Sequence, residues 1–252
     1  MATDAATNLD SGRAQMGVFS RIFGVFFEPK KTFEDIAGRP NFLVPMLITI
    51  LSGMALIYAF NTHVGWEAYL HRLLDNNVRM QQLTAEQRQQ AFDLQLKILP
   101  IGSYLGAIIA PAFIWLIGGG IALGIIRGLL GAPIRFAQVF SVMAYAWLPR
   151  VIYSALSIVV MYLKPPDQFD LQNAFASNPG AFMDPEKSSK FLYTLASSLD
   201  VFTIWVMLLT AVGLKAAGGK RLSFGGALFA VVLPWAVFTL IRGALAAAGL
   251  SN

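Results

Sequence analysis

The sequence predicts an all-α polytopic membrane protein, a bundle of five transmembrane helices with an N-terminal interfacial amphipathic helix. Hydrophobic residues make up 56% of the 252-residue chain and charged residues only 13%. The mean hydropathy is +0.59, which leaves too little polar surface for a soluble domain. The apolar residues gather in long segments that lack the alternation of strands. Helices are therefore the structure that satisfies their backbone groups in lipid.

Five segments reach the roughly 20 apolar residues that a helix needs to cross a bilayer core. They are residues 42–60, 98–126, 136–163, 191–214 and 222–250. Together they form a predicted membrane domain over residues 41–250. The first two contain no charged residue, whereas the last three contain one each: Arg150, Asp200 and Arg242.

The distribution of lysine and arginine predicts the orientation of the chain. With the N-terminus inside, the inner segments 1–41, 127–135 and 215–221 hold ten basic residues, and the longer outer segments 61–97 and 164–190 hold seven. Because cytoplasmic loops are enriched in basic residues, we expect a cytosolic N-terminus and a C-terminus outside. The pI near 9.6 then reflects membrane topology, and we expect no nucleic-acid partner.

The region before the first span divides into two parts. Residues 1–14 are polar, and we expect a disordered cytosolic tail. Residues 15–40 form an amphipathic segment, interrupted at Pro29, whose large apolar side chains recur at helical spacing. Its interfacial anchor residues are Phe19, Phe23, Phe26 and Phe27. We predict that these rings lie at the cytosolic membrane surface; a partner-docking element is the alternative.

Two patterns concern the second span. Thr84 and Gln87 have the spacing of a capping box, which predicts that a helix begins before the span. Small residues recur at four-residue steps inside it: Gly102, Gly106 and Ala110, then Gly120, Gly124 and Gly128. Such rows allow close approach of helix backbones in lipid, so we expect one row or the other to lie in close contact with a neighbouring helix.

The three charged residues within the spans form a predicted intramembrane polar cluster. A charge inside a bilayer is unfavourable unless it is paired. The topology brings Arg150, Asp200 and Arg242 toward one side of the membrane, so we expect Asp200 to contact one or both arginines. An internal structural ion pair is one interpretation. A polar site for an ion or an anionic headgroup is the other.

No enzyme motif is found in the sequence. Walker, dinucleotide-binding, Ser–His–Asp and His–Glu–x–x–His patterns are absent, and there is no cysteine. One row at four-residue steps offers potential metal ligands: His63, Glu67, His71 and Asp75. All four cannot share one helix face, so a solvated helix surface is the preferred interpretation. We predict no catalytic residue, no metal site and no cofactor.

Three stretches carry a family resemblance. Residues 26–37 read Phe-Phe-Glu-Pro-Lys-Lys-Thr-Phe-Glu-Asp-Ile-Ala, residues 144–149 read Ala-Tyr-Ala-Trp-Leu-Pro, and residues 198–205 read Ser-Leu-Asp-Val-Phe-Thr-Ile-Trp. In this order, and with five spans, they resemble the bacterial members of the YIP family, membrane proteins related to the eukaryotic Ypt/Rab-GTPase-interacting proteins. The resemblance covers residues 20–248. Its motif positions are Pro29, Phe33, Tyr145, Pro149, Asp200 and Trp205.

The resemblance implies an integral protein of the bacterial inner (plasma) membrane with a cytosolic N-terminus. Eukaryotic members are associated with vesicle traffic and membrane shaping. We therefore expect a non-enzymatic membrane-organising or scaffold protein, with membrane lipids as partners and with partner membrane proteins or a homo-oligomer as further candidates. The alternative is a small transporter or channel that uses the Arg/Asp polar cluster. A water-accessible cavity reaching Asp200 would favour this alternative.

Overall fold

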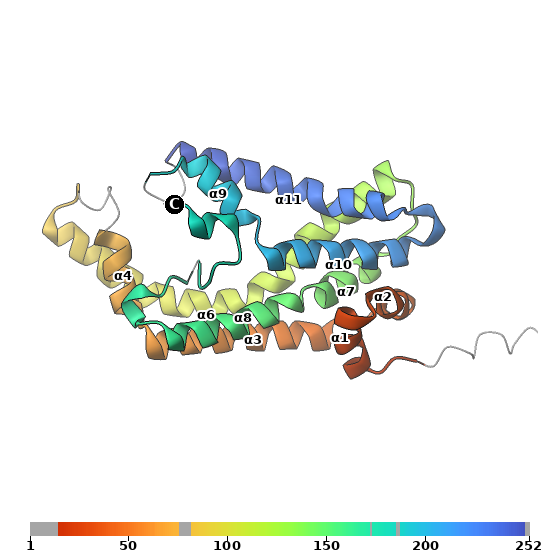
Figure 1. Cartoon of the computed structure of the whole chain (residues 1–252), viewed down its shortest axis with the longest axis horizontal. Coiled ribbons are helices and arrows are strands. Elements are labelled where there is room, and N and C mark those ends of the chain that lie inside the picture. Colours follow the sequence, from red (N-terminus) through yellow and green to blue (C-terminus); the bar gives the residue numbers. More distant parts are fainter. Residues whose placement is uncertain (1–14, 76–81, 172, 185–186, 250–252) are drawn as a thin grey trace, which may run out of the picture.

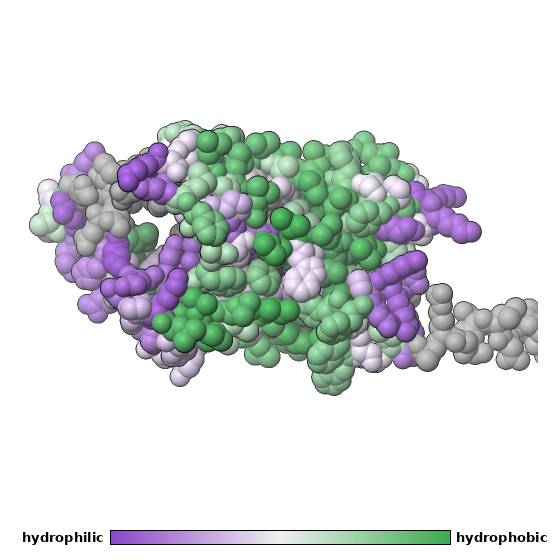
Figure 2. Space-filling view, viewed as in Figure 1, coloured by the Kyte–Doolittle hydropathy of each residue, from purple (hydrophilic) through white to green (hydrophobic). Residues whose placement is uncertain are grey.

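The computed structural model describes residues 15–75, 82–171, 173–184 and 187–249; within them the chain forms helices, turns and loops, and no strand. The prediction of five spans is confirmed, because five helical segments are long and apolar enough to cross a membrane. These are Leu43–His63, Ala85–Leu129, Phe136–Leu163, Val201–Arg221 and Phe224–Ala247. The spans run along the long axis of the molecule (Figure 1), and apolar surface covers its middle between two polar ends (Figure 2).

The spans are built from six α-helices and two short turns of other helix types. They are α3 (Leu43–His63), α6 (Ala85–Gly124) with the π-turn η1 (Ile125–Leu129), α7 (Phe136–Ala146), α8 (Pro149–Leu163), α10 (Val201–Gly218) with the 3-10 turn η4 (Gly219–Arg221), and α11 (Phe224–Ala247). Two short helices, α1 (Val18–Phe27) and α2 (Pro29–Gly38), lie at one end of the bundle, which we call the α1–α2 end (Figure 1). The opposite end, the α4 end, carries α4 (Trp66–Asp75), α9 (Lys190–Ser198), η2 (Pro166–Gln168) and η3 (Pro179–Phe182). The predicted tail, residues 1–14, lies outside the described residues.

Two spans begin elsewhere than the hydropathy predicts. The second belongs to a helix that starts at Ala85, where Thr84 and Gln87 form the predicted capping box. The fourth is not continuous over residues 191–214, because α9 ends at Ser198 and α10 begins at Val201. Leu199 is apolar, so hydropathy alone does not reveal this break. The carboxylate of Asp200 instead caps α10 and fixes where the helix starts.

The inward face of the amphipathic segment is part of the protein core. Val25 of α1 and Phe33 and Ile36 of α2 are fully buried. They belong to one hydrophobic cluster with side chains of α7 and α10, among them Val142 and Leu214. Burial of such side chains stabilises a fold by about 1.5–3 kcal/mol each. The two N-terminal helices are therefore docked on the bundle as part of its fold.

The predicted close packing of the glycine rows in α6 is wrong within the described chain. A Cβ atom added at Gly102, Gly106, Gly120, Gly124 or Gly128 would meet nothing within 4 Å there. The helix makes its close approaches on other faces: a Cβ at Gly53 of α3 would lie 3.4 Å from Ala107, and one at Gly119 would lie 3.3 Å from Val139. A row of small residues shows which face can pack closely, whereas the neighbouring helices decide which face does.

A glycine that allows three helices to pack closely is Gly213 in α10. A Cβ there would overlap Val142 and lie 2.8 Å from the ring of Phe33. We expect Gly213→Leu to separate α2 and α7 from α10 and to destabilise the protein by about 1–3 kcal/mol or more. Thermal unfolding of the purified protein in mild detergent measures this effect. Gly106→Leu is the matched control and should leave the melting temperature nearly unchanged; equal losses for both would contradict the packing described.

Candidate functional site

Asp200 joins three segments near the α4 end. Its Oδ1 accepts hydrogen bonds from the backbone N–H of Phe202 at 2.9 Å and of Thr203 at 3.1 Å, which caps α10. Nη1 of Arg150, from α8, lies 3.5 Å from the same oxygen. The hydroxyl of Ser177, from the loop before η3, donates to Oδ2. We call Arg150, Ser177 and Asp200 the Asp200 junction.

The structure brings together two of the three predicted cluster residues. Arg242 of α11 is exposed, and its guanidinium lies over the ring of Phe238 at 5.9 Å from the ring centre. Among the described residues, no ion pair links Arg242 to Asp200. The expected proximity of these three residues, a depth estimate within their spans, rested on an unbroken helix over residues 191–214. Because Asp200 instead stands at the start of α10, that estimate does not apply.

The chemistry of the junction is that of a structural cap. Asp200 is 7% exposed, and four donors share its two oxygens. Arg150 also stacks on Tyr153, with the guanidinium carbon 4.6 Å from the ring centre. A carboxylate occupied in this way has little capacity left for a transported ion. These contacts favour the structural interpretation of the pair.

A second ionic cluster, which the sequence reasoning missed, fixes the N-terminal helices. Asp35 of α2 accepts from Nε of Arg21 at 2.7 Å and from Nη2 of Arg39 at 2.8 Å. Nη1 of Arg21 also donates to the backbone carbonyl of Arg39 at 3.2 Å. We call Arg21, Asp35 and Arg39 the Asp35 latch. Two signals were available: the four-residue spacing of Asp35 and Arg39, and a single arginine in the otherwise uncharged α1.

The latch lies against the bundle. Arg21 is 6% exposed, although it is charged. Gln138 of α7 donates from Nε2 to the carbonyl of Ala37 at 2.8 Å, which ties the end of α2 to the start of α7. Such charge-assisted and buried contacts are strong because desolvated partners lose much when separated. They hold α1 in a fixed position at this end of the bundle.

The family-motif residues occupy structural positions. Pro29 and Pro149 are the first residues of α2 and α8, where a missing N–H has no consequence. Phe33 and Tyr145 are fully buried. Trp205 packs edge-on against Phe26, with ring centres 5.7 Å apart. The motif residues therefore begin two helices and supply contacts among α1, α2, α7 and α10.

The four anchor phenylalanines divide into two groups. Phe19, Phe23 and Phe27 are 79%, 62% and 81% exposed. Phe26 faces inward, where it packs on Trp205. Three large apolar rings thus project from a helix whose other side is held by the core and the latch. Whether these rings lie in a membrane surface stays a prediction.

The histidine row does not form a ligand cluster. The ring of His63 lies 4.6 Å from that of Tyr162, and the ring of His71 lies 4.3 Å from that of Phe92. Within the part of the chain that was searched, no group of three His, Cys, Asp or Glu residues is placed to hold a metal ion. The side chain of Asp75 lies outside the described residues. The histidines that are described pack on aromatic rings.

The chain has five apolar spans with an N-terminal helix pair docked on them. The Asp35 latch lies at the α1–α2 end and the Asp200 junction lies toward the α4 end. This architecture defines an integral membrane protein of the helical-bundle class. A family model for the Yip1 domain matches residues 23–245. The chain therefore belongs to the Yip1 domain family, as the resemblance of its motifs indicated. Comparisons with curated proteins and with solved structures gave no significant match.

Proposed function

We propose that the protein is a non-enzymatic membrane-organising or scaffold protein, which acts on lipids and partner proteins through its N-terminal helices. The observation that carries this proposal is the exposed phenylalanine face of α1. Phe19, Phe23 and Phe27 are solvent-accessible in the isolated chain. The Asp35 latch holds the opposite, buried side of α1. An apolar face that no described residue covers fits the headgroup boundary of a membrane.

The charge distribution supports a cytosolic position for this face. In segments 15–41, 127–135 and 215–221, which meet at the α1–α2 end, nine basic residues accompany three acidic ones. The inner leaflet is negatively charged and attracts basic residues. We accordingly propose that the N-terminus is cytosolic and the C-terminus outside, in the inner (plasma) membrane of a bacterium.

In this position α1 is inserted into only one leaflet of the bilayer. A helix lying in one leaflet adds area to that leaflet alone and responds to membrane curvature. Because α1 is fixed to a five-span bundle, it cannot leave the membrane as a free amphipathic helix does. We propose that the bundle positions α1 to shape the bilayer or to present its face to a partner. The occupied carboxylate of Asp200 gives no support to a transporter.

We expect the triple variant Phe19→Ser, Phe23→Ser, Phe27→Ser to keep its fold and lose membrane contact at α1. The chain has no cysteine, so Ser20→Cys provides a single labelling site on the exposed part of α1. An environment-sensitive fluorophore at this position should be quenched by spin-labelled lipid in proteoliposomes of the parent protein, and much less in the triple variant.

The same proteoliposomes test the proposed function. Electron microscopy should show smaller or more strongly curved vesicles with the parent protein than with the triple variant, at equal protein-to-lipid ratio. Phe26→Ser is the matched control, because its ring packs on Trp205 and its loss should lower the melting temperature. Identical vesicles for parent and triple variant, with the same partners recovered by both in mild-detergent purification, would refute the proposal.

A further inference from the structure

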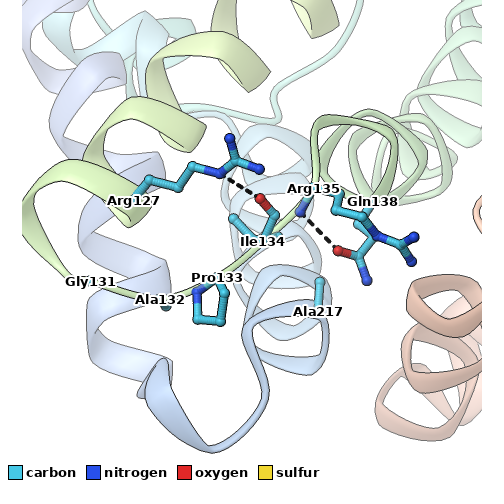
Figure 3. Close-up of a pocket in the computed structure, with 8 residues that line it drawn as sticks. All are labelled: Arg127, Gly131, Ala132, Pro133, Ile134, Arg135, Gln138 and Ala217. Atoms are coloured by element: carbon cyan, nitrogen blue, oxygen red, sulfur yellow. Dashed lines mark hydrogen bonds between the residues drawn. The ribbon is translucent and has the colours of Figure 1, made fainter.

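A pocket with a basic lining opens at the α1–α2 end, between η1, the loop that follows it and the end of α10. Its volume is about 540 Å³. Figure 3 shows Arg127 extending from η1 on one side of this loop and Gln138 from the start of α7 on the other, with Ala217 of α10 below. The guanidinium of Arg135 lies beyond the Gln138 amide and points away from Arg127. Among the described residues, no carboxylate lines the pocket. Its lining thus combines two cations with one amide.

Both arginines keep donors free for a ligand. Nε of Arg127 donates to the carbonyl of Ile134 at 2.7 Å, which orients the guanidinium. Within the described residues, its two Nη atoms have no acceptor, and the guanidinium of Arg135 has neither an ion pair nor a hydrogen bond. A guanidinium presents its donors in a fork that matches phosphate oxygens. The ligand indicated by this chemistry is a phosphate group.

The walls of the pocket are fixed by local structure. The π-turn η1 replaces the last α-helical turn before the loop, and such turns are frequent at functional sites. Gly131 has a positive φ of 64°, a conformation that other residues rarely adopt. Gln138 accepts from the N–H of Arg135 at 2.9 Å while it donates to Ala37. These features hold the backbone of the pocket in place. Rotation of the exposed Arg135 side chain brings its guanidinium to a ligand that is bound by Arg127.

The position of the pocket favours a lipid over a soluble ligand. It lies where three spans end, since Arg127, Arg135 and Ala217 belong to or adjoin the second, third and fourth spans. Apolar side chains next to it project outward: Leu129 is 72% exposed and Phe136 is 39% exposed. A molecule bound here can place an anionic group within reach of the two arginine side chains and its acyl chains along the apolar belt seen in Figure 2.

We propose that this pocket binds the phosphate group of an anionic phospholipid. The site uses no residue of α1, so this proposal goes beyond the phenylalanine face and stands or falls separately from it. The phosphate bonds to Arg127 and Arg135, and the acyl chains lie against Leu129 and Phe136. A zwitterionic phospholipid binds less well, because its choline or ethanolamine cation has no carboxylate to meet in the pocket.

The test is native mass spectrometry of the full chain, titrated in mild detergent with phosphatidylglycerol or phosphatidylcholine. Arg127→Gln with Arg135→Gln should weaken phosphatidylglycerol binding about tenfold or more, as expected for lost charge-assisted hydrogen bonds. Lys220→Gln with Arg221→Gln is the matched control. It removes the same charge from exposed positions at the same end of the bundle and should change binding less than twofold.

The single variant Arg135→Gln guards against misfolding, because the Arg135 side chain makes no hydrogen bond or ion pair with any described residue. It should retain the melting temperature and still weaken binding several-fold. Inorganic phosphate, added alone, should displace the lipid only at far higher concentration. Equal binding of both lipids, equal losses in the two double variants, or unchanged binding by Arg135→Gln would overturn the proposal. Displacement by inorganic phosphate at the lipid's own concentration would overturn the lipid assignment in favour of a phosphate site.

Discussion

Asp35→Ala is expected to release the N-terminal helices from the bundle. The substitution leaves Arg21, which is 6% exposed, without the carboxylate that lies 2.7 Å from its Nε. Removing one partner of a buried ion pair costs about 3–5 kcal/mol, because the other charge stays desolvated. We expect a marked fall in melting temperature in detergent and rapid proteolysis between α1 and α3, while the five spans remain inserted in the membrane.

Two comparisons separate the stability loss caused by breaking the Asp35 latch from the loss caused by removing any negative charge. Glu28→Ala removes a carboxylate from an exposed pair with Lys31, whose side chains are 60% and 72% exposed, and exposed pairs contribute about 0–1 kcal/mol. The double variant Asp35→Asn with Arg21→Met should recover stability relative to Asp35→Ala, since neither charge is then stranded. If Asp35→Ala were no more harmful than Glu28→Ala, the latch would not hold the helices.

Asp200→Ala is expected to have a comparably large effect at the other end. It removes the cap of α10, which is worth about 1 kcal/mol, and leaves Arg150 and Ser177 without their acceptor. Hydrogen bonds that involve a charged group contribute about 1.5–3 kcal/mol each. We therefore expect a loss of at least about 3 kcal/mol in the free energy of unfolding, measured by denaturant or thermal unfolding in detergent.

Two variants divide this loss into its causes. Asp200→Asn keeps an acceptor for the N–H groups of Phe202 and Thr203 but removes the charge, so it should be less damaging than Asp200→Ala. Arg242→Ala should change stability little, because Arg242 is exposed and, among the described residues, has no ion pair with Asp200. A loss for Arg242→Ala as large as that for Asp200→Ala would restore the three-residue cluster expected from the sequence.

Features that depend on local composition were predictable from the amino-acid sequence alone. Five apolar segments predict five spans because a bilayer core imposes a length on each helix, and the structure has five. The capping box at Thr84 depends on side chains three residues apart and was also predictable. The three motifs identified the family, and the structure explains them as helix starts and buried contacts, such as Pro149 and Phe33.

Contacts between residues far apart in the sequence depend on how the helices pack. Arg21 and Asp35 lie on two helices, and only the turn at Glu28 and Pro29 brings them within 2.7 Å. Arg150 reaches Asp200 across 50 residues, whereas Arg242, on the neighbouring α11, does not. Hydropathy and spacing report the environment along one helix. The angle and rotation at which helices pack are set by side chains from several elements at once, so neither the partners of a buried charge nor the packed face of a glycine row can be read from one segment.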